Sequence, residues 1–234
     1  MNPASGTLYG IGVGPGDPEL LTLKALRLIH DCQVLAWPAP ESGTGLAWEI
    51  VRSHLREDST QERLPLRMPI SVDPFPAQQA YDESARLLDR ELRSGKSVGV
   101  LCEGDPLFYG SFMYLLERLS GSFPVEVIPG VSSPMACAAA ARWPMAFRSE
   151  PWTVLPGTLP EDELRQRLRQ PGAFALMKVG RHFSKLQRVL EELGLAQDAI
   201  YVEHASRPDQ KVEPLHEVEA QEVPYFSMIL LRNA

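Results

Sequence analysis

Three short glycine-rich segments contain the residues best suited to bind a ligand. They are residues 12–17 (GVGPGD), 102–106 (CEGDP) and 129–133 (PGVSS), and each includes or follows the end of a short apolar run typical of a buried strand. Glycine allows backbone N–H and C=O groups to approach a ligand closely. Because ligands of α/β proteins collect at the carboxyl ends of strands, the three turns predict one shared pocket.

Two carboxylates in these turns have two interpretations. Asp17 and Asp105 each stand in a turn that precedes an expected helix, so either side chain is suited to cap that helix. Either is also placed to face a ligand in the shared pocket. The residue types are compatible with both roles.

The glycines do not complete the common nucleotide-binding fingerprints. In the G-x-G-x-x-G pattern the third glycine falls on Pro15 in one register and on Asp17 in the other. Residues 94–97 (SGKS) imitate the end of a P-loop, but Arg90 stands where the upstream glycine belongs, and the turn leads into a strand. A nicotinamide-dependent oxidoreductase and a P-loop enzyme are therefore not indicated.

The elements that position these turns repeat as strand, glycine turn and helix, which predicts α/β layers with a mainly parallel sheet. The expected strands are residues 7–13, 34–37, 97–102, 125–128, 152–155, 173–179, 200–203 and 225–231. The expected helices are residues 46–55, 77–94, 108–119, 135–141, 161–169 and 183–193, and one that begins at residue 18 and includes residues 20–29.

The character of the sequence changes near residues 146–151. We therefore expect two α/β domains with mainly parallel or mixed sheets. The N-terminal domain, residues 1–147, contains the three glycine turns, and the C-terminal domain comprises residues 148–234.

Composition narrows the class of protein. The 234 residues carry a formal net charge of −7, with 44% apolar and 23% charged residues, as is typical of globular proteins. The acidity argues against non-specific nucleic-acid binding. No apolar run approaches the roughly 20 residues of a membrane span, and no secretion signal is seen, so we expect a cytoplasmic protein without a membrane partner.

Cysteine and histidine spacing predicts no metal site. Cys32, Cys102 and Cys137 form neither a C-x-x-C pair nor a zinc pattern, so we expect three reduced thiols. The five histidines have no metal-ligand spacing on a helix.

Four segments together resemble the tetrapyrrole (class III) S-adenosylmethionine-dependent methyltransferases. They are residues 12–24 (GVGPGDPELLTLK), 104–106 (GDP), 129–133 (PGVSS) and 201–210 (YVEHASRPDQ). The matches keep the family's order and span nearly the whole chain. The resemblance implies two α/β domains with a cofactor cleft between them, S-adenosylmethionine as methyl donor and a homodimer.

The resemblance also implies roles for individual residues. Asp105 and Glu103 are the candidate catalytic groups, as balance for the sulfonium charge or as the base. The residues expected to bind the cofactor are Pro15, Glu103, Gly104, Asp105, Leu107, Phe108, Ser132, Ser133, Met177, Ala205, Ser227 and Met228. The residues expected to bind the substrate are Gly14, Pro15, Gly16, Asp17, Arg142 and Arg181, with Arg148, Lys178 and Arg207 as further candidates for its carboxylates.

Three further segments resemble the branch of this family that methylates precorrin-2, or its cobalt-loaded equivalent, at the C-20 meso carbon in cobalamin synthesis. They are residues 155–160 (LPGTLP), 177–181 (MKVGR) and 224–231 (PYFSMILL). Alternatives are methylation at another position of the macrocycle, a non-tetrapyrrole acceptor, or a non-catalytic protein that binds a nucleotide-like ligand.

Overall fold

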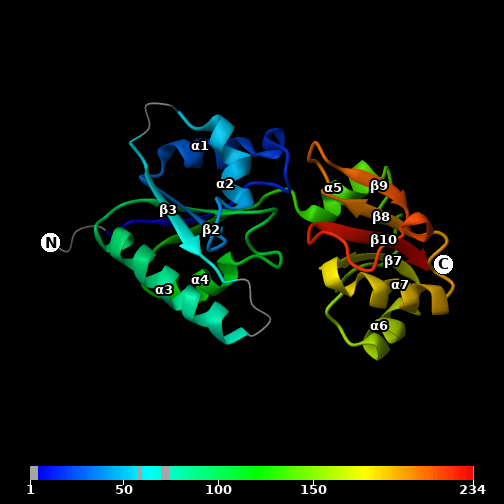
Figure 1. Ribbon diagram of the computed structural model, residues 1–234. Helices are drawn as coiled ribbons and strands as arrows, with labels where there is room; N and C mark the ends of the chain where they lie inside the picture. The colour runs from blue at the N-terminus through cyan, green and yellow to red at the C-terminus, as the bar shows by residue number, and fades with distance from the viewer. Residues whose placement is uncertain (1–4, 57–59, 70–73, 234) are drawn as a thin grey trace. The chain divides into compact units, whose positions relative to one another are not determined.

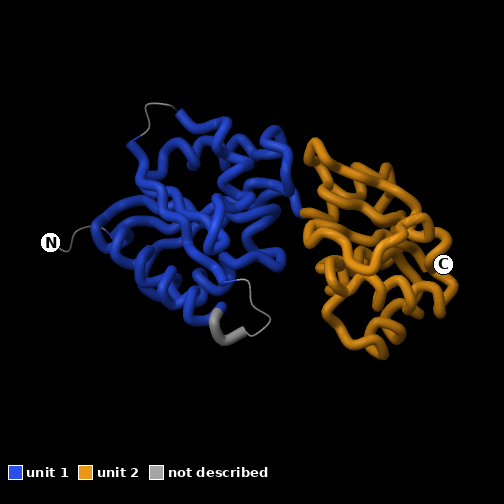
Figure 2. Tube along the Cα trace, in the orientation of Figure 1, with its two compact units in different colours: residues 1–132 blue, residues 133–234 orange. Residues whose placement is uncertain are grey.

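The computed structural model describes residues 5–56, 60–69 and 74–233, and the chain divides into two compact units, residues 1–132 and 133–234 (Figures 1 and 2). Both units are α/β, as the sequence predicts. The division falls before α5 (Ser133–Ala140), which contacts strands of the second unit. The sequence analysis instead placed this helix in the N-terminal domain.

The first unit contains a five-stranded parallel sheet with the order β3-β2-β4-β1-β5. Its strands are β1 (Leu8–Gly12), β2 (Val34–Ala39), β3 (Glu62–Arg67), β4 (Val98–Cys102) and β5 (Val125–Ile128). In the register, Gly12 pairs with Cys102 and Ile11 pairs with Ile128. The carboxyl ends of β1, β4 and β5 therefore lie next to one another, and each leads into one of the three glycine turns.

Helices cover both faces of this sheet (Figure 1). On one face α1 (Leu23–Asp31) and α2 (Leu46–Val51) pack against Ile11, Leu35 and Leu101. On the other, α3 (Pro74–Arg93) and α4 (Phe112–Leu119) pack against alternate residues of the same strands, including Leu8 and Val100. Strand side chains point alternately to opposite faces, so each strand serves two cores.

The start of the first helical segment differs from the sequence expectation. A short 3-10 turn, η1 (Pro18–Leu20), is capped by Asp17 and is separate from α1, whose first turn is capped by Thr22. Leu23 is 87% exposed rather than on the buried face. The error arose because Leu20, Leu21 and Leu23 fit a helical period that the Thr22 cap interrupts.

Two other local expectations in the first unit were incomplete. The structure contains β3, which is absent from the strands expected from the sequence. Pro65 lies within it, and proline is tolerated there because β3 is an edge strand. In addition, α4 begins at Phe112 instead of residue 108, because turns occupy the preceding residues.

The second unit contains a mixed five-stranded sheet with the order β6-β7-β10-β8-β9. Its strands are β6 (Trp152–Pro156), β7 (Gly172–Met177), β8 (Ile200–Glu203), β9 (Lys211–Pro214) and β10 (Ser227–Asn233). Only β6 and β7 are parallel, and β10 runs antiparallel to both β7 and β8. The exposed edge strand β9 was not expected from the sequence.

One apolar core supports the second unit. It is formed mainly by α6 (Glu161–Leu168), α7 (Phe183–Glu192) and the sheet residues that face them, and its largest buried rings are Phe174, Phe183 and Tyr201. The side chain of Phe183 contacts Tyr201 edge to face at 5.8 Å between ring centroids. Helix α5 packs against β8 and β10.

The three cysteines are buried and unpaired in the structure. Burial raises the pKa of the Cys32 and Cys137 thiols to about 12, and also raises that of Cys102. Such thiols stay protonated at neutral pH and are poor nucleophiles. No helix within the described residues is long and apolar enough to cross a membrane.

Candidate functional site

The three glycine turns of the first unit contact one another directly. After β1, Gly14 and Gly104 form an isolated bridge: the Gly104 N–H donates to the Gly14 carbonyl at 2.8 Å, and the Gly14 N–H donates to the Gly104 carbonyl at 3.3 Å. The Val13 N–H also donates to the Cys102 carbonyl at 2.9 Å. Beyond the parallel pairing of β1 and β4, the two turns are therefore joined by an antiparallel backbone bridge.

The third turn closes on the first two because neither side has a side chain at the contact. A Cβ placed on Gly12 would lie 2.6 Å from the Gly130 nitrogen, and a Cβ on Gly130 would lie 2.2 Å from the Gly104 carbonyl oxygen. Real Cβ atoms do not approach backbone this closely. Gly104 itself has φ +64°, a left-handed conformation that favours glycine. The three turns therefore meet, as a shared ligand pocket requires, and the pocket itself stays a prediction.

Asp105 joins two of the turns through its carboxylate. Its Oδ1 accepts a hydrogen bond from the Leu107 N–H at 2.9 Å, and its Oδ2 accepts one from the Gly130 N–H at 3.1 Å. Because α4 begins at Phe112, Asp105 does not cap that helix, and this interpretation was wrong. Both carboxylate oxygens hold backbone instead, so Asp105 fixes the geometry of the turns.

Glu103 has a different environment. Its Oε1 accepts a hydrogen bond from the Ala47 N–H at 3.3 Å, in the first turn of α2. Gly45, which precedes this helix, gives it no side-chain cap. Burial raises the pKa of the Glu103 carboxyl, and the hydrogen bond from Ala47 partly offsets this effect. A carboxylate with a raised pKa is suited to accept a proton near neutral pH.

The remaining candidates near this site belong to the first and third turns themselves. Pro15 and Gly16 are half-buried in a bend, and Asp17 accepts a hydrogen bond from the Glu19 N–H at 2.8 Å. The capping interpretation of Asp17 is thus confirmed. Ser132 and Ser133 are half-buried and end the third turn, with Ser133 as the first residue of α5.

The segment after Asp105 presents apolar and aromatic groups. Leu107 is exposed, Phe108 is half-buried, and the ring of Phe108 meets that of Tyr109 edge to face at 5.0 Å between centroids. Tyr109 has φ +55°, which is uncommon for an aromatic residue and is typical of a constrained turn.

The expected cofactor residues of the second unit gather at one edge of its sheet. In the register, Ser227 pairs with Glu203, and Ile229 pairs with Leu176. Met177, at the end of β7, and Met228, near the start of β10, therefore lie at the same end of the strands, and Ala205 follows the end of β8 there. The His204 N–H donates to the Phe226 carbonyl at 2.9 Å, which joins the loops after β8 and before β10.

A network of charged and polar groups surrounds this edge. Glu203 is only 8% exposed; its Oε2 accepts a hydrogen bond from the Tyr201 hydroxyl at 2.8 Å, and its Oε1 lies 3.4 Å from Lys211 Nζ. Burial, followed by the hydrogen bond to Glu203, raises the pKa of Tyr201. Asp209 Oδ2 lies 2.7 Å from His204 Nδ1.

The candidate cations of the second unit lie in separate segments. Arg142, Arg148 and Arg181 are exposed, the first two with left-handed backbone and the third in the turn η3 (Gly180–His182). Lys178 follows β7 and also has a left-handed backbone. Arg207 differs because its Nε pairs with Asp209 Oδ1 at 3.1 Å, so its positive charge is partly neutralised within its own loop.

Arg232 holds the segment that carries Arg142 and Arg148, and the sequence analysis gave Arg232 no role. Arg232 Nε pairs with Glu150, its Nη2 donates to the Pro144 carbonyl at 2.8 Å, and its guanidinium lies 4.7 Å from the Trp143 ring centroid. No spacing signal connects residues so far apart in the chain.

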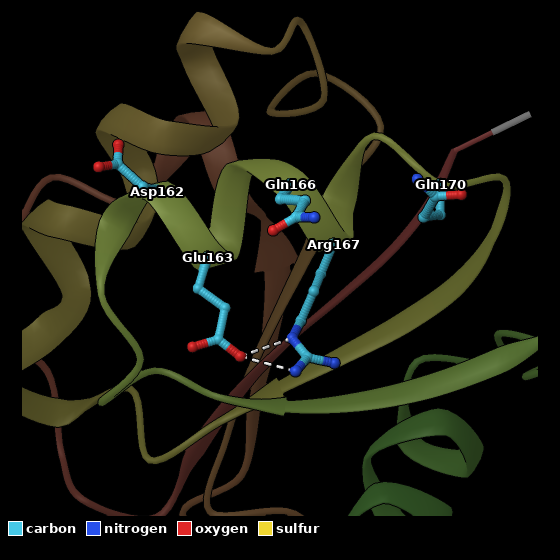
Figure 3. Close-up of a pocket in the computed structure, with 5 residues that line it drawn as sticks. All are labelled: Asp162, Glu163, Gln166, Arg167 and Gln170. Atoms are coloured by element: carbon cyan, nitrogen blue, oxygen red, sulfur yellow. Dashed lines mark hydrogen bonds and ion pairs between the residues drawn. The ribbon is translucent and has the colours of Figure 1, made fainter.

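A surface hollow on α6 contains none of these residues. It is lined by Asp162, Glu163, Gln166, Arg167 and Gln170 (Figure 3). Glu163 and Arg167 point toward each other across one helical turn and form an ion pair at 2.6 Å. Such exposed pairs are common on helices and indicate no binding site. No cluster of three or more metal-ligating side chains occurs among the residues that the structure describes.

The family model for tetrapyrrole (corrin/porphyrin) methylases matches residues 7–219. The chain belongs to this family. Its tetrapyrrole methylase fold is shared with the uroporphyrin-III C-methyl transferase from Thermus thermophilus solved with S-adenyl homocysteine. That structure has a TM-score of 0.69 and 28% identity, with 97% of each chain covered.

Other relatives of this tetrapyrrole methylase have names from cobalamin synthesis. The precorrin-2 C(20)-methyltransferase of a Sinorhizobium species is 39% identical, with 97% of this chain and 95% of the relative covered. The cobalamin biosynthesis protein CobIJ of Mycobacterium bovis is 38% identical over 97% of this chain. The chain spans 46% of the length of CobIJ, or about half.

Proposed function

We propose that the chain is an S-adenosylmethionine-dependent methyltransferase that methylates precorrin-2, or its cobalt-loaded equivalent, at the C-20 meso carbon in cobalamin biosynthesis. The observation that carries the proposal is the direct contact of the three glycine turns at the carboxyl edge of the first sheet. These turns contain the family's motifs. The name of the Sinorhizobium relative, which matches nearly its whole length, supports the choice of acceptor.

The residues fit S-adenosylmethionine as the cofactor. We assign the amino-acid and ribose portion to Glu103, Gly104 and Asp105, with Leu107, Phe108 and Pro15 beside them, and the methionine end to Ser132 and Ser133. Met177, Ala205, Ser227 and Met228 are assigned to the adenine. The fit is supported by Ala205, which is 7% exposed and whose backbone N–H and C=O form no hydrogen bond within the described residues. A buried backbone group without a partner is rare unless a ligand supplies one.

When bound, this cofactor supplies a methyl group on a positively charged sulfur, a good leaving group that needs no metal. A new C–C bond forms at the acceptor carbon while the S–C bond breaks, and the carbon then loses its proton. The meso carbon of a reduced tetrapyrrole is enamine-like and nucleophilic, so the protein need not activate it with a strong base. The protein instead aligns the methyl group with the acceptor carbon and excludes water from the site.

Glu103 is the better candidate to accept the released proton, directly or through water. Asp105 already accepts two backbone hydrogen bonds, whereas Glu103 accepts one, from the Ala47 N–H, and has a pKa raised by burial. We therefore assign Glu103 as the base and Asp105 as the residue that holds the turns.

The acceptor carries several carboxylates, which arginine binds well. We assign Arg142, Arg148 and Arg181 to these carboxylates because their side chains are exposed. The residues 14–17 of the first turn are proposed to face the macrocycle. Arg207 is a weaker candidate, since Asp209 already pairs with it.

A methyl-transfer assay with a panel of reduced tetrapyrroles tests this function. The protein is incubated with S-adenosylmethionine labelled in the methyl group, and the product's methylated carbon is located by NMR. Label at C-20 of precorrin-2 supports the proposal. Label at another position would assign the chain to another activity of the family, and tight binding of S-adenosylhomocysteine without transfer to any acceptor would indicate a non-catalytic binding protein.

The assembly and location expected from the resemblance also belong to this proposal. We propose a homodimer in the cytoplasm, where the three unpaired cysteines remain reduced. Light scattering on the purified chain measures the assembly: the mass of two chains supports the dimer, and the mass of one chain contradicts it.

A further inference from the structure

The loop after β8 contains two strained backbone conformations in three residues. His204 has φ +51° and Ser206 has φ +67°, both in the left-handed region. This region is uncommon for residues other than glycine, although histidine is enriched in it, and such positions cluster at binding sites. Ala205 lies between the two and carries the unpaired backbone groups described above.

Two side chains from the end of the same loop hold these strained residues. Asp209 Oδ2 lies 2.7 Å from His204 Nδ1, and Gln210 Oε1 accepts a hydrogen bond from the Ser206 N–H at 2.7 Å. Asp209 thus contacts the His204 ring, whose Nδ1 also lies 3.9 Å from Glu203 Oε1, and Gln210 binds the Ser206 backbone. Backbone hydrogen bonds add to the turn: the Arg207 N–H donates to the His204 carbonyl at 3.0 Å, and the Gln210 N–H donates to the Arg207 carbonyl at 3.1 Å.

The geometry explains why Ala205 keeps an unpaired N–H and C=O. A regular strand would pair these groups with its neighbours, but the left-handed residues on either side turn the chain out of the sheet. Adenine presents a donor, its 6-amino group, next to an acceptor ring nitrogen. A single residue with a free carbonyl and a free N–H can bind both atoms.

We propose that Asp209 and Gln210 are positioning residues that hold the loop 204–206 in its left-handed form and so present the Ala205 backbone to the adenine of the methyl donor. The inference rests on the proposed function, because it assumes that the donor is S-adenosylmethionine. Neither side chain touches the donor in this scheme. They act through His204 and Ser206.

Calorimetry with S-adenosylhomocysteine and with its 6-deaminated analogue, S-inosylhomocysteine, tests the proposal. The wild type should prefer the amino form. In Gln210→Ala and Asp209→Asn, we expect affinity for S-adenosylhomocysteine to fall about tenfold, equivalent to ~1.4 kcal/mol, while affinity for the inosine analogue changes little. The KM for the donor should rise with little change in kcat.

A matched control and a rescue variant separate positioning from a general loss of stability. Asp162→Asn removes another ion-paired aspartate of the same unit and should leave both affinities unchanged. Adding Ser206→Gly to Gln210→Ala should recover part of the lost affinity, since glycine adopts the left-handed form without strain.

The outcomes distinguish the two proposals. If the wild type binds S-adenosylhomocysteine and the variants keep its affinity and its preference over the inosine analogue, the positioning role is wrong and the proposed function stands. An equal loss for both ligands would also overturn it. If the wild type binds neither ligand, the proposed function itself fails.

Discussion

The turns of the first unit and the loop 204–210 of the second reach defined backbone geometries by opposite means. In the first unit, Gly12, Gly104 and Gly130 lack side chains, so their backbones contact one another directly. In the second, His204 and Ser206 are not glycines, and Asp209 and Gln210 hold them in place. The first arrangement depends on the absence of side chains at the glycines, and the second depends on two particular side chains. Mutations should therefore disrupt the two regions in different ways.

The largest effect is expected from a methyl group added to the first region. In Gly130→Ala the new Cβ would lie 2.2 Å from the Gly104 carbonyl oxygen, so the turns must separate. We expect affinity for S-adenosylhomocysteine to fall by about 100-fold or more, equivalent to ~2.8 kcal/mol. Calorimetry on the purified protein measures this loss of affinity.

Gly121→Ala is the matched control, because a Cβ at Gly121 would meet no atom within 4 Å. This variant should bind as the wild type does. If Gly130→Ala also bound normally while remaining folded, the contact between the turns would have no role in ligand binding.

Glu103→Gln is expected to lower kcat by about 100-fold, at the lower end of the effect of removing a general base. The wild-type rate should rise with pH through the raised pKa of Glu103, and this rise should disappear in the variant. The loss of kcat should persist at saturating donor, because Glu103 is also assigned to bind the donor and its loss also weakens affinity. A variant that retained both full kcat and the acidic limb of the pH profile would contradict the role of Glu103 as base.

Thermal unfolding adds an independent test of the Glu103 environment. A carboxyl with a raised folded-state pKa stabilises the fold below its unfolded pKa, and this contribution is lost as pH rises through the folded pKa. Glutamine has no charge to bury, so Glu103→Gln should unfold at a higher temperature than the wild type at about pH 8. The difference in unfolding temperature should vanish at about pH 4, close to the pKa of glutamate in the unfolded chain.

Asp105→Asn tests whether a side chain is also needed among the glycine turns. The amide nitrogen would replace one oxygen that now accepts an N–H from Leu107 or Gly130, which leaves one backbone donor facing another donor. We expect affinity for S-adenosylhomocysteine to fall about tenfold, consistent with the ~1.4 kcal/mol of one such hydrogen bond. Because Asp105 is not assigned as the base, kcat at saturating donor should stay within about threefold of the wild type.

The same contrast explains what the sequence could predict. The glycine turns were recognisable because glycine, proline and aspartate after an apolar run indicate a strand end, and the parallel sheet then brings these ends together. Only the structure, however, showed that both Asp105 oxygens bind backbone. Its partner Gly130 lies 25 residues further along the chain.

The second region was less predictable because its geometry depends on side chains. Asp209 and Gln210 were noticed only as part of a family motif, since nothing in their types indicates that they hold His204 and Ser206 in left-handed conformations. A different cause applies to β3, because Pro65 interrupts the sequence pattern expected of a strand. The helical period likewise extended across Thr22, which caps α1.

The smallest expected effect concerns the Thr22 cap of α1. The Thr22 hydroxyl accepts a hydrogen bond from the Ala25 N–H at 3.1 Å, and Thr22→Ala should lower the free energy of unfolding by ~1 kcal/mol. Asp17→Ala removes the cap of η1 and should cost a similar amount, but Asp17 is also proposed to face the macrocycle. Chemical unfolding measures the first effect, and the KM for the tetrapyrrole measures the second. Only Asp17→Ala should raise that KM; equal KM values in both variants would contradict a role for Asp17 in binding the tetrapyrrole.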